Sequence, residues 1–364
     1  MFPTHLSEIL KRVDQVDPVQ YARTRNFKNG AVSRLSPYIS RGVISTRFVY
    51  HSLLGRGYTR KTAEKYIQEL AWRDYWQLNW KVLGDRINHH LRPPKYTPKH
   101  FEIPSCILSC NTGIEAVDSA LNEFYESGYM HNHMRMYVAS IICSIAKSDW
   151  LLPAQWMYYH LLDADWASNA LSWQWVAGTN SNKMYFANQD NINKYWSGRQ
   201  KDTFLDFSYD QLLKNEVPKV LLKTEPIRYE TRLPERQTPE LYENRPTLIY
   251  NNYNLDPFWR KEGAFNRILL LEPSLFQKYP IAQRTLDFIL RLSRNINGIQ
   301  VFVGEFRELE QHIPGTSVCY FKEHPLSQHY KGIEEPRDWM FEGADYTTGS
   351  FFKFWKSCLK TLNE

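Results

Sequence analysis

The sequence lacks several features that would place it in a well-defined class. It has no apolar run of about 18 residues, so no transmembrane helix is expected. Its first residues, MFPTHLSEILKRV, lack the apolar core of a signal peptide. The five cysteines are odd in number and fit no disulfide or zinc spacing, which predicts reduced thiols and a cytoplasmic protein. The GxGxxG and Walker A loops are missing as well, which excludes the usual nucleotide cradles.

Aromatic residues, in contrast, are abundant. The chain of 364 residues carries 12 Trp, 23 Tyr and 19 Phe. Such an excess fits either a bulky core or surfaces that stack on bases and flat cofactors and pass electrons. The formal net charge of +6 mildly favours a polyanionic partner such as nucleic acid.

The hydrophobic pattern changes along the chain. Residues 1–200 show apolar spacing of three and four, which predicts helices over 41–54, 61–83, 114–147 and 153–162. Residues 201–245 are rich in charge and proline and are predicted to be a linker or surface loop. Residues 246–364 contain short apolar runs at 247–252, 267–273, 298–304 and 317–321, with a helical segment at 279–296. The predicted fold is mainly α, an all-helical domain followed by a small C-terminal α/β unit with parallel strands.

The segment SRLSPYISRG contains a helix start. Ser36 is the expected N-cap, with Pro37 at the first helical position. The free N–H groups of such a start, with the hydroxyl of Ser33, could bind a phosphate. A plain capped helix explains the same residues.

A second segment, ELAWRDYW, places Glu69, Trp72, Arg73 and Trp76 on one helix face. One interpretation is an amphipathic surface with a Glu69–Arg73 ion pair. The other is a pocket wall, in which a flat base stacks on Trp72 while Glu69 accepts its N–H groups.

In YMHNHMRM, Arg135 precedes an apolar helical stretch and therefore needs a carboxylate, for which Asp163 and Asp165 are the candidates. The pair is either structural or part of a cofactor site. In the second case Arg135 and Asp163 flank the edge of a flavin, with Asn169 near its N5 atom.

Two further groups in this region bear on redox and metal chemistry. Trp150 and Trp173 could carry an electron from the surface to a cofactor, although isolated tryptophans are more often core residues. His131 and His133 are two residues apart and point to different helix faces, so no metal site is predicted.

Six segments in this order, SRLSPYIS, ELAWRDYW, TGIEAVD, MHNHMRM, DADWASN and WQW, resemble the FAD-binding catalytic domain of the photolyase/cryptochrome flavoproteins. The resemblance covers residues 15–190. It implies that FAD, active in its reduced anionic form, is bound by Tyr21, Ser33, Leu35, Ser36, Tyr66, Arg73, Arg135, Asp163, Asp165 and Asn169. It implies a pocket for a cyclobutane pyrimidine dimer, whose catalytic residues are Glu69, Trp72, Asn132, Met136 and Trp175. It also implies electron transfer through Trp173 and Trp150.

The chain departs from the family pattern in several places. Val32 stands where relatives have Thr, and His133 where many have Arg. The third tryptophan of the electron-transfer chain is missing, and Tyr96 is the expected substitute, with Trp156 and Trp80 as alternatives. Relatives usually carry an α/β antenna domain before the helical domain, whereas here an α/β unit follows it. That unit is interpreted as a permuted, antenna-like domain, and no antenna pigment is predicted.

The resemblance implies a deoxyribodipyrimidine photo-lyase. Damaged DNA would be bound through its phosphates, and the cyclobutane dimer, flipped into the pocket, would be split by an electron from light-excited, reduced FAD. The protein is expected to act as a monomer. The alternative is a cryptochrome-like blue-light photoreceptor without repair activity, and a third hypothesis is a light-independent flavoprotein that binds nucleic acid.

Overall fold

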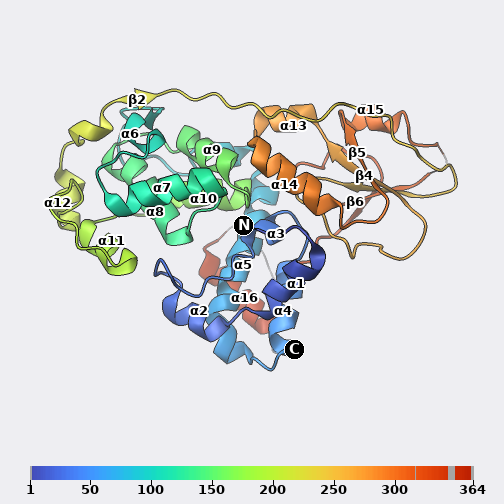
Figure 1. The fold of residues 1–364 in the computed structure, drawn as a ribbon, viewed down its shortest axis with the longest axis horizontal. Coiled ribbons are helices and arrows are strands. Elements are labelled where there is room, and N and C mark those ends of the chain that lie inside the picture. The colour runs from blue at the N-terminus through green and yellow to red at the C-terminus, as the bar shows by residue number, and fades with distance from the viewer. Residues whose placement is uncertain (1, 316, 343–348, 362–364) are drawn as a thin grey trace. The chain divides into compact units, whose positions relative to one another are not determined.

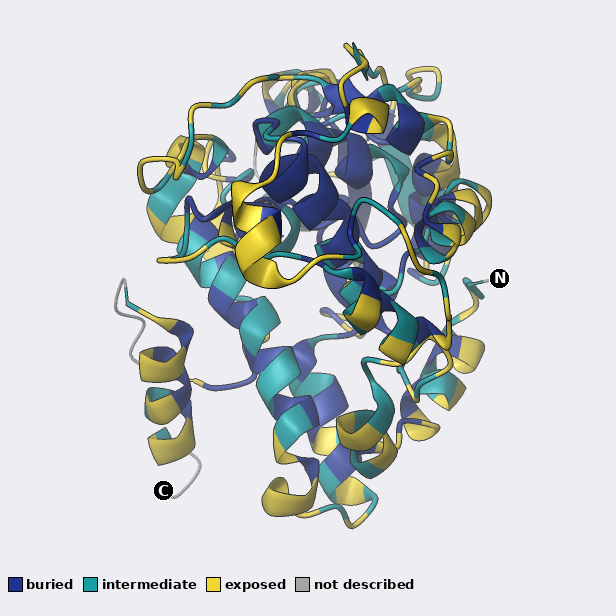
Figure 2. Cartoon of the chain, turned by 90° about the vertical axis from the view of Figure 1, so that its left-hand side faces the viewer, coloured by how far each residue is buried: buried dark blue, intermediate teal, exposed yellow. Residues whose placement is uncertain are grey.

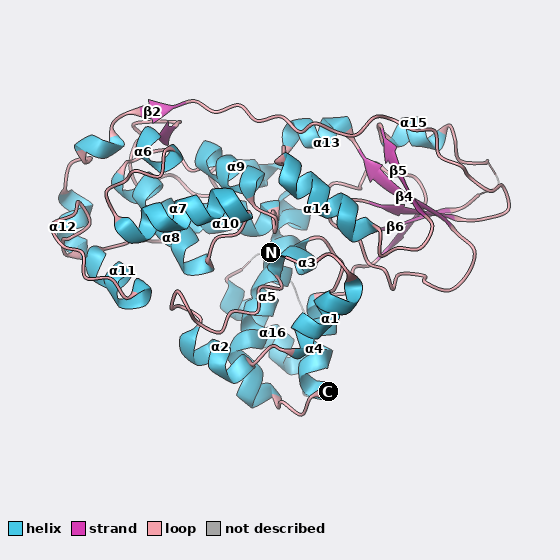
Figure 3. Cartoon of the chain, in the orientation of Figure 1, coloured by secondary structure: helices cyan, strands magenta, loops and turns pink. Residues whose placement is uncertain are grey.

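The computed structural model describes residues 2–315, 317–342 and 349–361. The chain forms two compact units. Unit 1 combines Met1–Ala22, Ser33–Val82 and Glu230–Glu364, and unit 2 combines Arg23–Val32 and Leu83–Tyr229. Helices dominate, and strands are confined to two small sheets (Figure 3). Unit 1 therefore joins N-terminal helices to the C-terminal α/β region.

The helical part of unit 1 comprises α1 (Leu6–Asp14), α2 (Pro18–Thr24), α3 (Ser36–Ser40), α4 (Thr46–Gly55), α5 (Arg60–Leu83) and α16 (Phe351–Thr361). Ser45 caps α4 by accepting the amide hydrogen of Phe48 at 2.8 Å. The C-terminal helix α16 buries Phe351, Phe354, Trp355 and Cys358, which recur at helical spacing. Figure 2 shows its exposed outer side in yellow, above the C-terminal label.

The α/β part of unit 1 is built on a five-stranded sheet with the order β5-β4-β3-β6-β7. Its elements are β3 (Thr247–Tyr250), β4 (Asn266–Leu271), α13 (Pro273–Lys278), α14 (Gln283–Ser293), β5 (Ile299–Val303), α15 (Phe306–Glu310), β6 (Cys319–Lys322) and β7 (Ile333–Glu335) (Figure 1). All neighbouring strands are parallel, which confirms the expected α/β unit. The strand β7 was not expected from the sequence.

The packing around this sheet explains why the sequences of its strands are continuous apolar runs. Ile249, Ile268 and Phe321 come from three adjacent strands and pack in one buried cluster with Phe302 and Phe306. Every residue of β3 and β4 is buried. A parallel sheet covered on both faces favours uninterrupted β-branched and aromatic residues over an alternating pattern.

The loop before α4 lies directly against the loop that follows β3. Gly42 has φ +65°, and a Cβ atom there would lie 2.5 Å from the carbonyl oxygen of Tyr253. The amide of Leu255 also donates to the carbonyl of Arg41 at 2.9 Å. Only glycine fits both the left-handed backbone and the close approach, so this position connects the helices to the sheet.

Unit 2 is almost entirely helical. Its elements are η1 (Gly84–Asn88), β1 (Ile103–Pro104), α6 (Ser105–Leu108), α7 (Glu115–Ser127), α8 (Asn132–Ser140), the π-helix η2 (Ile141–Ile145), α9 (Leu151–His160), α10 (Trp166–Ala177), α11 (Gln189–Trp196), α12 (Tyr209–Lys214), η3 (Lys219–Leu221) and β2 (Thr224–Glu225). The helix α10 packs against both α8 and α9. The helix expected over 114–147 is interrupted, because Gly128 ends α7 in a left-handed conformation with φ 69°.

The proline- and charge-rich segment 201–245 contains α12, η3 and β2, and β2 pairs antiparallel with β1. The domain boundaries at residues 200 and 245 stay predictions. All five cysteines are free. No helix in the described part of the chain is long and apolar enough to cross a membrane.

Candidate functional site

The candidate residues are divided between the two units. Unit 1 contains Tyr21, Ser33, Leu35, Ser36, Tyr66, Glu69, Trp72 and Arg73. Unit 2 contains Tyr96, Asn132, Arg135, Met136, Trp150, Asp163, Asp165, Asn169, Trp173 and Trp175. Each half has its own local geometry.

A buried ion pair lies at the centre of the half in unit 2. Nη2 of Arg135, on α8, lies 3.0 Å from both carboxylate oxygens of Asp163, and its Nε donates to the carbonyl of Met130 at 2.8 Å. The side chain of Asp163 is 2% exposed and that of Arg135 21%. Of the two aspartates expected as partners, Asp163 therefore forms the pair, and the guanidinium is held in one orientation.

Asp165 has a different local role. It is the N-cap of α10, where its carboxylate accepts the hydroxyl of Ser168 at 2.7 Å and, more weakly, the amide of Ser168 at 3.4 Å. A negative charge at this position also favours the helix dipole. One turn later, the side-chain amide of Asn169 donates to the carbonyl of Ala154 on α9 at 2.8 Å. This bond fixes the amide of Asn169 against the neighbouring helix.

Three further candidates in unit 2 have solvent-accessible side chains. Asn132 is the exposed first residue of α8, and Met136, one turn further on, is half-buried. Trp175, on α10, is 40% exposed, and its ring lies tilted to that of Tyr185 at 6.0 Å. An exposed indole and an exposed amide can each contact a ligand without any rearrangement of the core.

The tryptophans of the expected electron-transfer chain are buried. Trp150 is 1% exposed and Trp173 is 2% exposed. Nε1 of Trp150 has no hydrogen-bond partner among the described residues. The hydroxyl of Tyr96 donates to the carbonyls of Ser148, at 3.0 Å, and of Cys143, and burial raises the pKa of this phenol far above its usual value. Among the alternatives, Trp156 donates to the hydroxyl of Tyr125 at 3.0 Å, and Trp80 lies in unit 1.

In unit 1, two aromatic candidates are in contact. The rings of Tyr21 and Tyr66 meet edge to face at 4.8 Å, and the hydroxyl of Tyr66 is hydrogen-bonded to Ser33. Burial raises the pKa of Tyr66 to about 12, although the bond to Ser33 counteracts this. Tyr21, Tyr66 and Ser33 therefore form one connected group.

The helix start at Ser36 differs from the prediction. Ser36 is the first residue of α3, and Leu35, which is buried, occupies the N-cap position without a side-chain cap. The expected serine cap is therefore wrong by one residue. Pro37 lies in the first turn, as its fixed φ favours. The helix has only 5 residues, so the hydroxyls of this segment matter more than a helix dipole.

The face of α5 that carries Glu69 and Trp72 is partly covered. Glu69 forms an ion pair with Lys65 at 3.0 Å, one turn earlier on the helix. The ring of Trp72 stacks on that of Phe351 from α16, with centroids 3.6 Å apart and planes at 8°. This contact joins residues far apart in the chain and was not predicted. The only sequence signal for it is the apolar spacing of the FFKFW segment.

Residues 66–209 match the sequence profile described as the FAD binding domain of DNA photolyase. These residues belong to the photolyase/cryptochrome family. The segment contains the Arg135–Asp163 pair, the cap formed by Asp165 and the exposed Asn132. The predicted family is thus confirmed.

Named relatives fall in both branches of the photolyase/cryptochrome family. A protein of Alkalihalophilus pseudofirmus named deoxyribodipyrimidine photo-lyase is 31% identical over 172 residues, which are 46% of this chain and 36% of the relative. A Xenopus laevis protein named cryptochrome DASH is 31% identical over 173 residues, 43% of this chain and 32% of the relative. The chain thus spans about a third of the length of the curated relatives it matches.

Among solved structures, the Synechocystis cryptochrome is 26% identical and has a TM-score of 0.45, with 52% of this chain and 42% of that chain covered.

Proposed function

We propose that the protein is a light-driven deoxyribodipyrimidine photo-lyase that repairs cyclobutane pyrimidine dimers in DNA. The observation that carries this proposal is the family segment itself, in which Arg135, paired with the buried Asp163, lies on the same helix as the exposed Asn132 and the half-buried Met136. A fixed charge pair beside accessible recognition groups is suited to a site that binds a flat cofactor on one side and a substrate on the other.

FAD is the proposed cofactor, and the chemistry of the residues fits it. Arg135 and the amide of Asn169 are donors held in fixed orientations, and Asp163 and Asp165 are nearby acceptors. The isoalloxazine ring has both carbonyl and N–H groups at its edge, so this donor and acceptor set can bind it. When bound in its reduced, anionic state, FAD would supply the light-driven electron transfer that the repair requires, without net redox change.

The protein's own residues would supply placement and electrostatics. In unit 2, Arg135 keeps a positive charge at the cofactor edge because its guanidinium is held by Asp163 and by the carbonyl of Met130. Such a charge stabilises an anionic ring without any reorganisation during the reaction. In unit 1, Tyr21, Ser33 and Tyr66 form the connected group proposed to hold the phosphate and ribityl portion, together with Leu35, Ser36 and Arg73.

The lesion would be recognised by exposed and partly exposed groups. Asn132 and Glu69 are proposed to hydrogen-bond the dimer carbonyls, Met136 to pack against the dimer, and Trp175 and Trp72 to stack on its rings. Trp175 is accessible as it stands, while one face of Trp72 is covered by Phe351. Stacking of a base on an aromatic side chain contributes about 1–3 kcal/mol. The net charge of +6 supports binding through DNA phosphates.

Repair of a defined oligonucleotide tests the proposal. A duplex with a single cyclobutane thymine dimer is incubated with protein that has been chemically reduced with FAD present, and dimer loss is measured under blue light and in the dark. We expect light-dependent loss, reduced about tenfold or more in Asn132→Ala, because an amide that stabilises developing charge is removed. Asn122→Ala, on the exposed face of α7, is the matched control. No loss of dimers under light would refute repair.

The second candidate is a cryptochrome-type photoreceptor, which uses the same cofactor without repair. The stack of Phe351 on Trp72 favours it, because this contact occupies one face of a proposed lesion plate. Trp173→Phe separates photoreduction from repair. We expect it to abolish light-driven reduction of the bound flavin while leaving repair by pre-reduced protein intact. Photoreduction without any dimer loss in the wild type would support the photoreceptor.

A further inference from the structure

A cavity of about 200 Å³ lies within unit 1, beside the carboxyl ends of the strands β3 and β6 of the five-stranded sheet. From β3 the chain proceeds through β4 to β5 on one side of the sheet, whereas β6 and β7 lie on the other. The order therefore reverses between β3 and β6. In open parallel sheets, ligands bind outside the carboxyl ends of the strands at this reversal. Asn251, Tyr253 and Asn254 follow β3, His324 follows β6, and all four line the cavity.

Two residues that line the cavity each have a buried N–H donor without a hydrogen-bond partner among the described residues. His324 is 7% exposed, and its Nδ1 accepts the amide hydrogen of Leu326 at 3.2 Å. Burial lowers the pKa of His324 well below its usual value, so the ring is neutral and its proton is on Nε2. Neither Nε2 of His324 nor Nδ2 of Asn254 has a hydrogen-bond partner among the described residues. Unpaired buried donors cost free energy, which a ligand with acceptor oxygens would recover.

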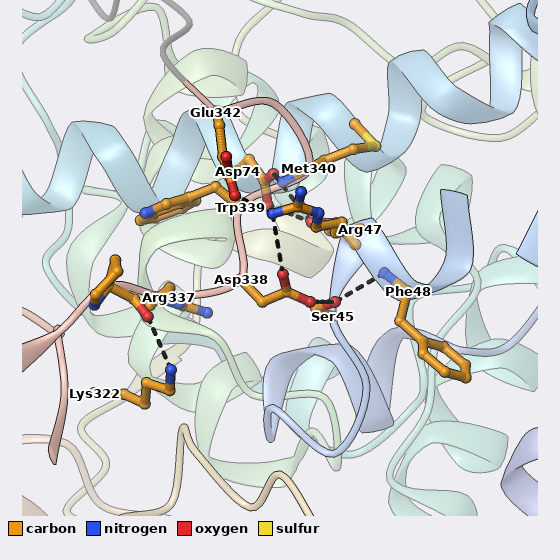
Figure 4. Close-up of polar contacts among 12 residues, drawn as sticks. Ser45, Arg47, Phe48, Asp74, Lys322, Arg337, Asp338, Trp339, Met340 and Glu342 are labelled. Carbon is orange, nitrogen blue, oxygen red and sulfur yellow. Dashed lines mark hydrogen bonds and ion pairs between the residues drawn. The ribbon is translucent and has the colours of Figure 1, made fainter. Parts of the chain in front are cut away.

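The charged groups around the cavity already have hydrogen-bond partners within the protein. Nζ of Lys322 donates to the carbonyl of Pro336 at 3.1 Å, and Nη1 of Arg337 donates to Gln77 at 2.8 Å. Glu323 accepts Nε1 of Trp339 at 2.6 Å. In Figure 4, Ser45 donates to Asp338 and accepts the amide of Phe48. Because the cations bind protein groups, the cavity is better suited to an uncharged polar ligand than to a phosphate.

The lining of the cavity also includes hydrogen-bond acceptors and flat aromatic rings. Asp74, which is buried, and Asp256, which is half-buried, both line the cavity. Oδ1 of Asp256 accepts the amide of Phe258 at 2.8 Å, and each carboxylate keeps lone pairs for a further donor. The ring of Tyr253 is stacked on that of His324 at 4.4 Å. A cavity of about 200 Å³ is smaller than the roughly 300–1,000 Å³ typical of drug-sized ligands, which excludes a dinucleotide.

We propose that this cavity binds a small planar heterocycle with adjacent carbonyl and ring N–H groups, such as the base of a uridine or guanosine nucleoside. The carbonyl oxygen accepts the N–H groups of His324 and Asn254, and the ring N–H donates to Asp74 or Asp256. Arg73 also lines this cavity. The site lies within unit 1 and needs neither light nor a DNA lesion.

Binding of uridine and guanosine to the full chain tests this proposal by calorimetry, with FAD in excess to fill the proposed cofactor site. His324→Phe keeps the flat ring against Tyr253 and Trp80 but removes the donor, and Asn254→Asp replaces the donor by an acceptor. We expect each to weaken binding about three- to tenfold, as for one lost hydrogen bond. The matched controls His51→Phe and Asn122→Asp, both exposed positions, should bind as the wild type does.

Adenosine and inorganic phosphate complete the set of probes. Adenosine lacks the carbonyl and the ring N–H, so it should bind at least tenfold more weakly than uridine. The proposal is overturned if neither uridine nor guanosine binds, if both cavity variants bind like the wild type, or if phosphate alone displaces uridine. Circular dichroism checks folding, and if His324→Phe does not fold, the isosteric Asn254→Asp decides the outcome. Loss of dimer repair with intact nucleoside binding would refute the proposed function alone.

Discussion

The buried pair of Arg135 and Asp163 should respond very differently to the removal of each partner. The side chain of Asp163 is 2% exposed, whereas that of Arg135 is 21% exposed and also donates to the carbonyl of Met130. Arg135→Met therefore leaves a carboxylate with almost no access to water. Asp163→Asn leaves a guanidinium that still has a carbonyl partner and some solvent.

The magnitudes follow from this asymmetry. Loss of one partner from a buried ion pair costs about 3–5 kcal/mol, because the remaining charge is uncompensated. We expect Arg135→Met to fall in that range. For Asp163→Asn we expect about 1–3 kcal/mol, typical of a hydrogen bond lost from a charged group. The double variant Arg135→Met/Asp163→Leu should recover most of the larger loss, since it removes both charges.

Urea denaturation of the FAD-free protein, followed by circular dichroism, measures these free energies of unfolding. Hydrogen exchange of the α8 amides reports the local effect, since that helix carries Arg135. With the single variant Asp163→Leu added, Arg135→Met and the double variant form a cycle that isolates the coupling between the two side chains. If Asp163→Asn destabilises the protein as much as Arg135→Met does, or if the double variant is the least stable, the argument from burial is wrong.

Three further predictions concern unit 1. Burial raises the pKa of Asp74 from 3.8 to about 6. The folded state therefore binds a proton at Asp74 more tightly than the unfolded state does. The resulting stabilisation is complete below about pH 4 and is lost as the pH rises through about 6. The wild type should therefore lose up to about 3 kcal/mol across this window that Asp74→Asn does not lose, and thermal melts of both proteins at several pH values would show the difference. Phe351→Ala removes the ring that stacks on Trp72 and should destabilise the packing of α16 by about 3–5 kcal/mol. Hydrogen exchange over residues 351–361 should become faster, and unchanged exchange would contradict the stacking geometry. Gly42→Ala places a Cβ atom 2.5 Å from the carbonyl of Tyr253 at a positive φ and should lower the melting temperature by several degrees, whereas Gly57→Ala, also at positive φ but in open space, should cost less.

The helical half of the chain could be predicted with some success because its signals are local. Apolar spacing along 61–83 corresponds to α5, which spans Arg60–Leu83. The helix expected over 114–147 was too long, because Gly128 adopts a left-handed conformation that ends α7. A glycine in the sequence does not by itself predict the end of a helix, since glycine also occurs inside helices.

The choice between Asp163 and Asp165 could not be made from the sequence. Both carboxylates lie close to one another in the chain, and either could have approached Arg135. In the structure Asp165 accepts the amide and hydroxyl of Ser168 as the cap of α10, and Asp163 faces Arg135. The packing of α8 against α10 decides which carboxylate is within reach.

The strand pattern beyond residue 246 predicted parallel strands but not their order. The reversal between β3 and β6 is a property of long-range pairing, for example of Leu248 with Tyr320. The cavity at that reversal, and with it the unpaired donor of His324, could therefore not be anticipated.

The sequence by itself determined which chemical groups this protein has, where most of its helices and strands lie, and that residues 66–209 belong to the photolyase/cryptochrome family. Local periodicity and short motifs carry that information, because they depend on neighbours within a few turns. The tertiary structure alone decided the partner of Arg135, the cover of Trp72 by Phe351 and the cavity beside β3 and β6. These features arise from contacts between distant segments, which form only where burial of apolar surface outweighs the entropy of closing a long loop.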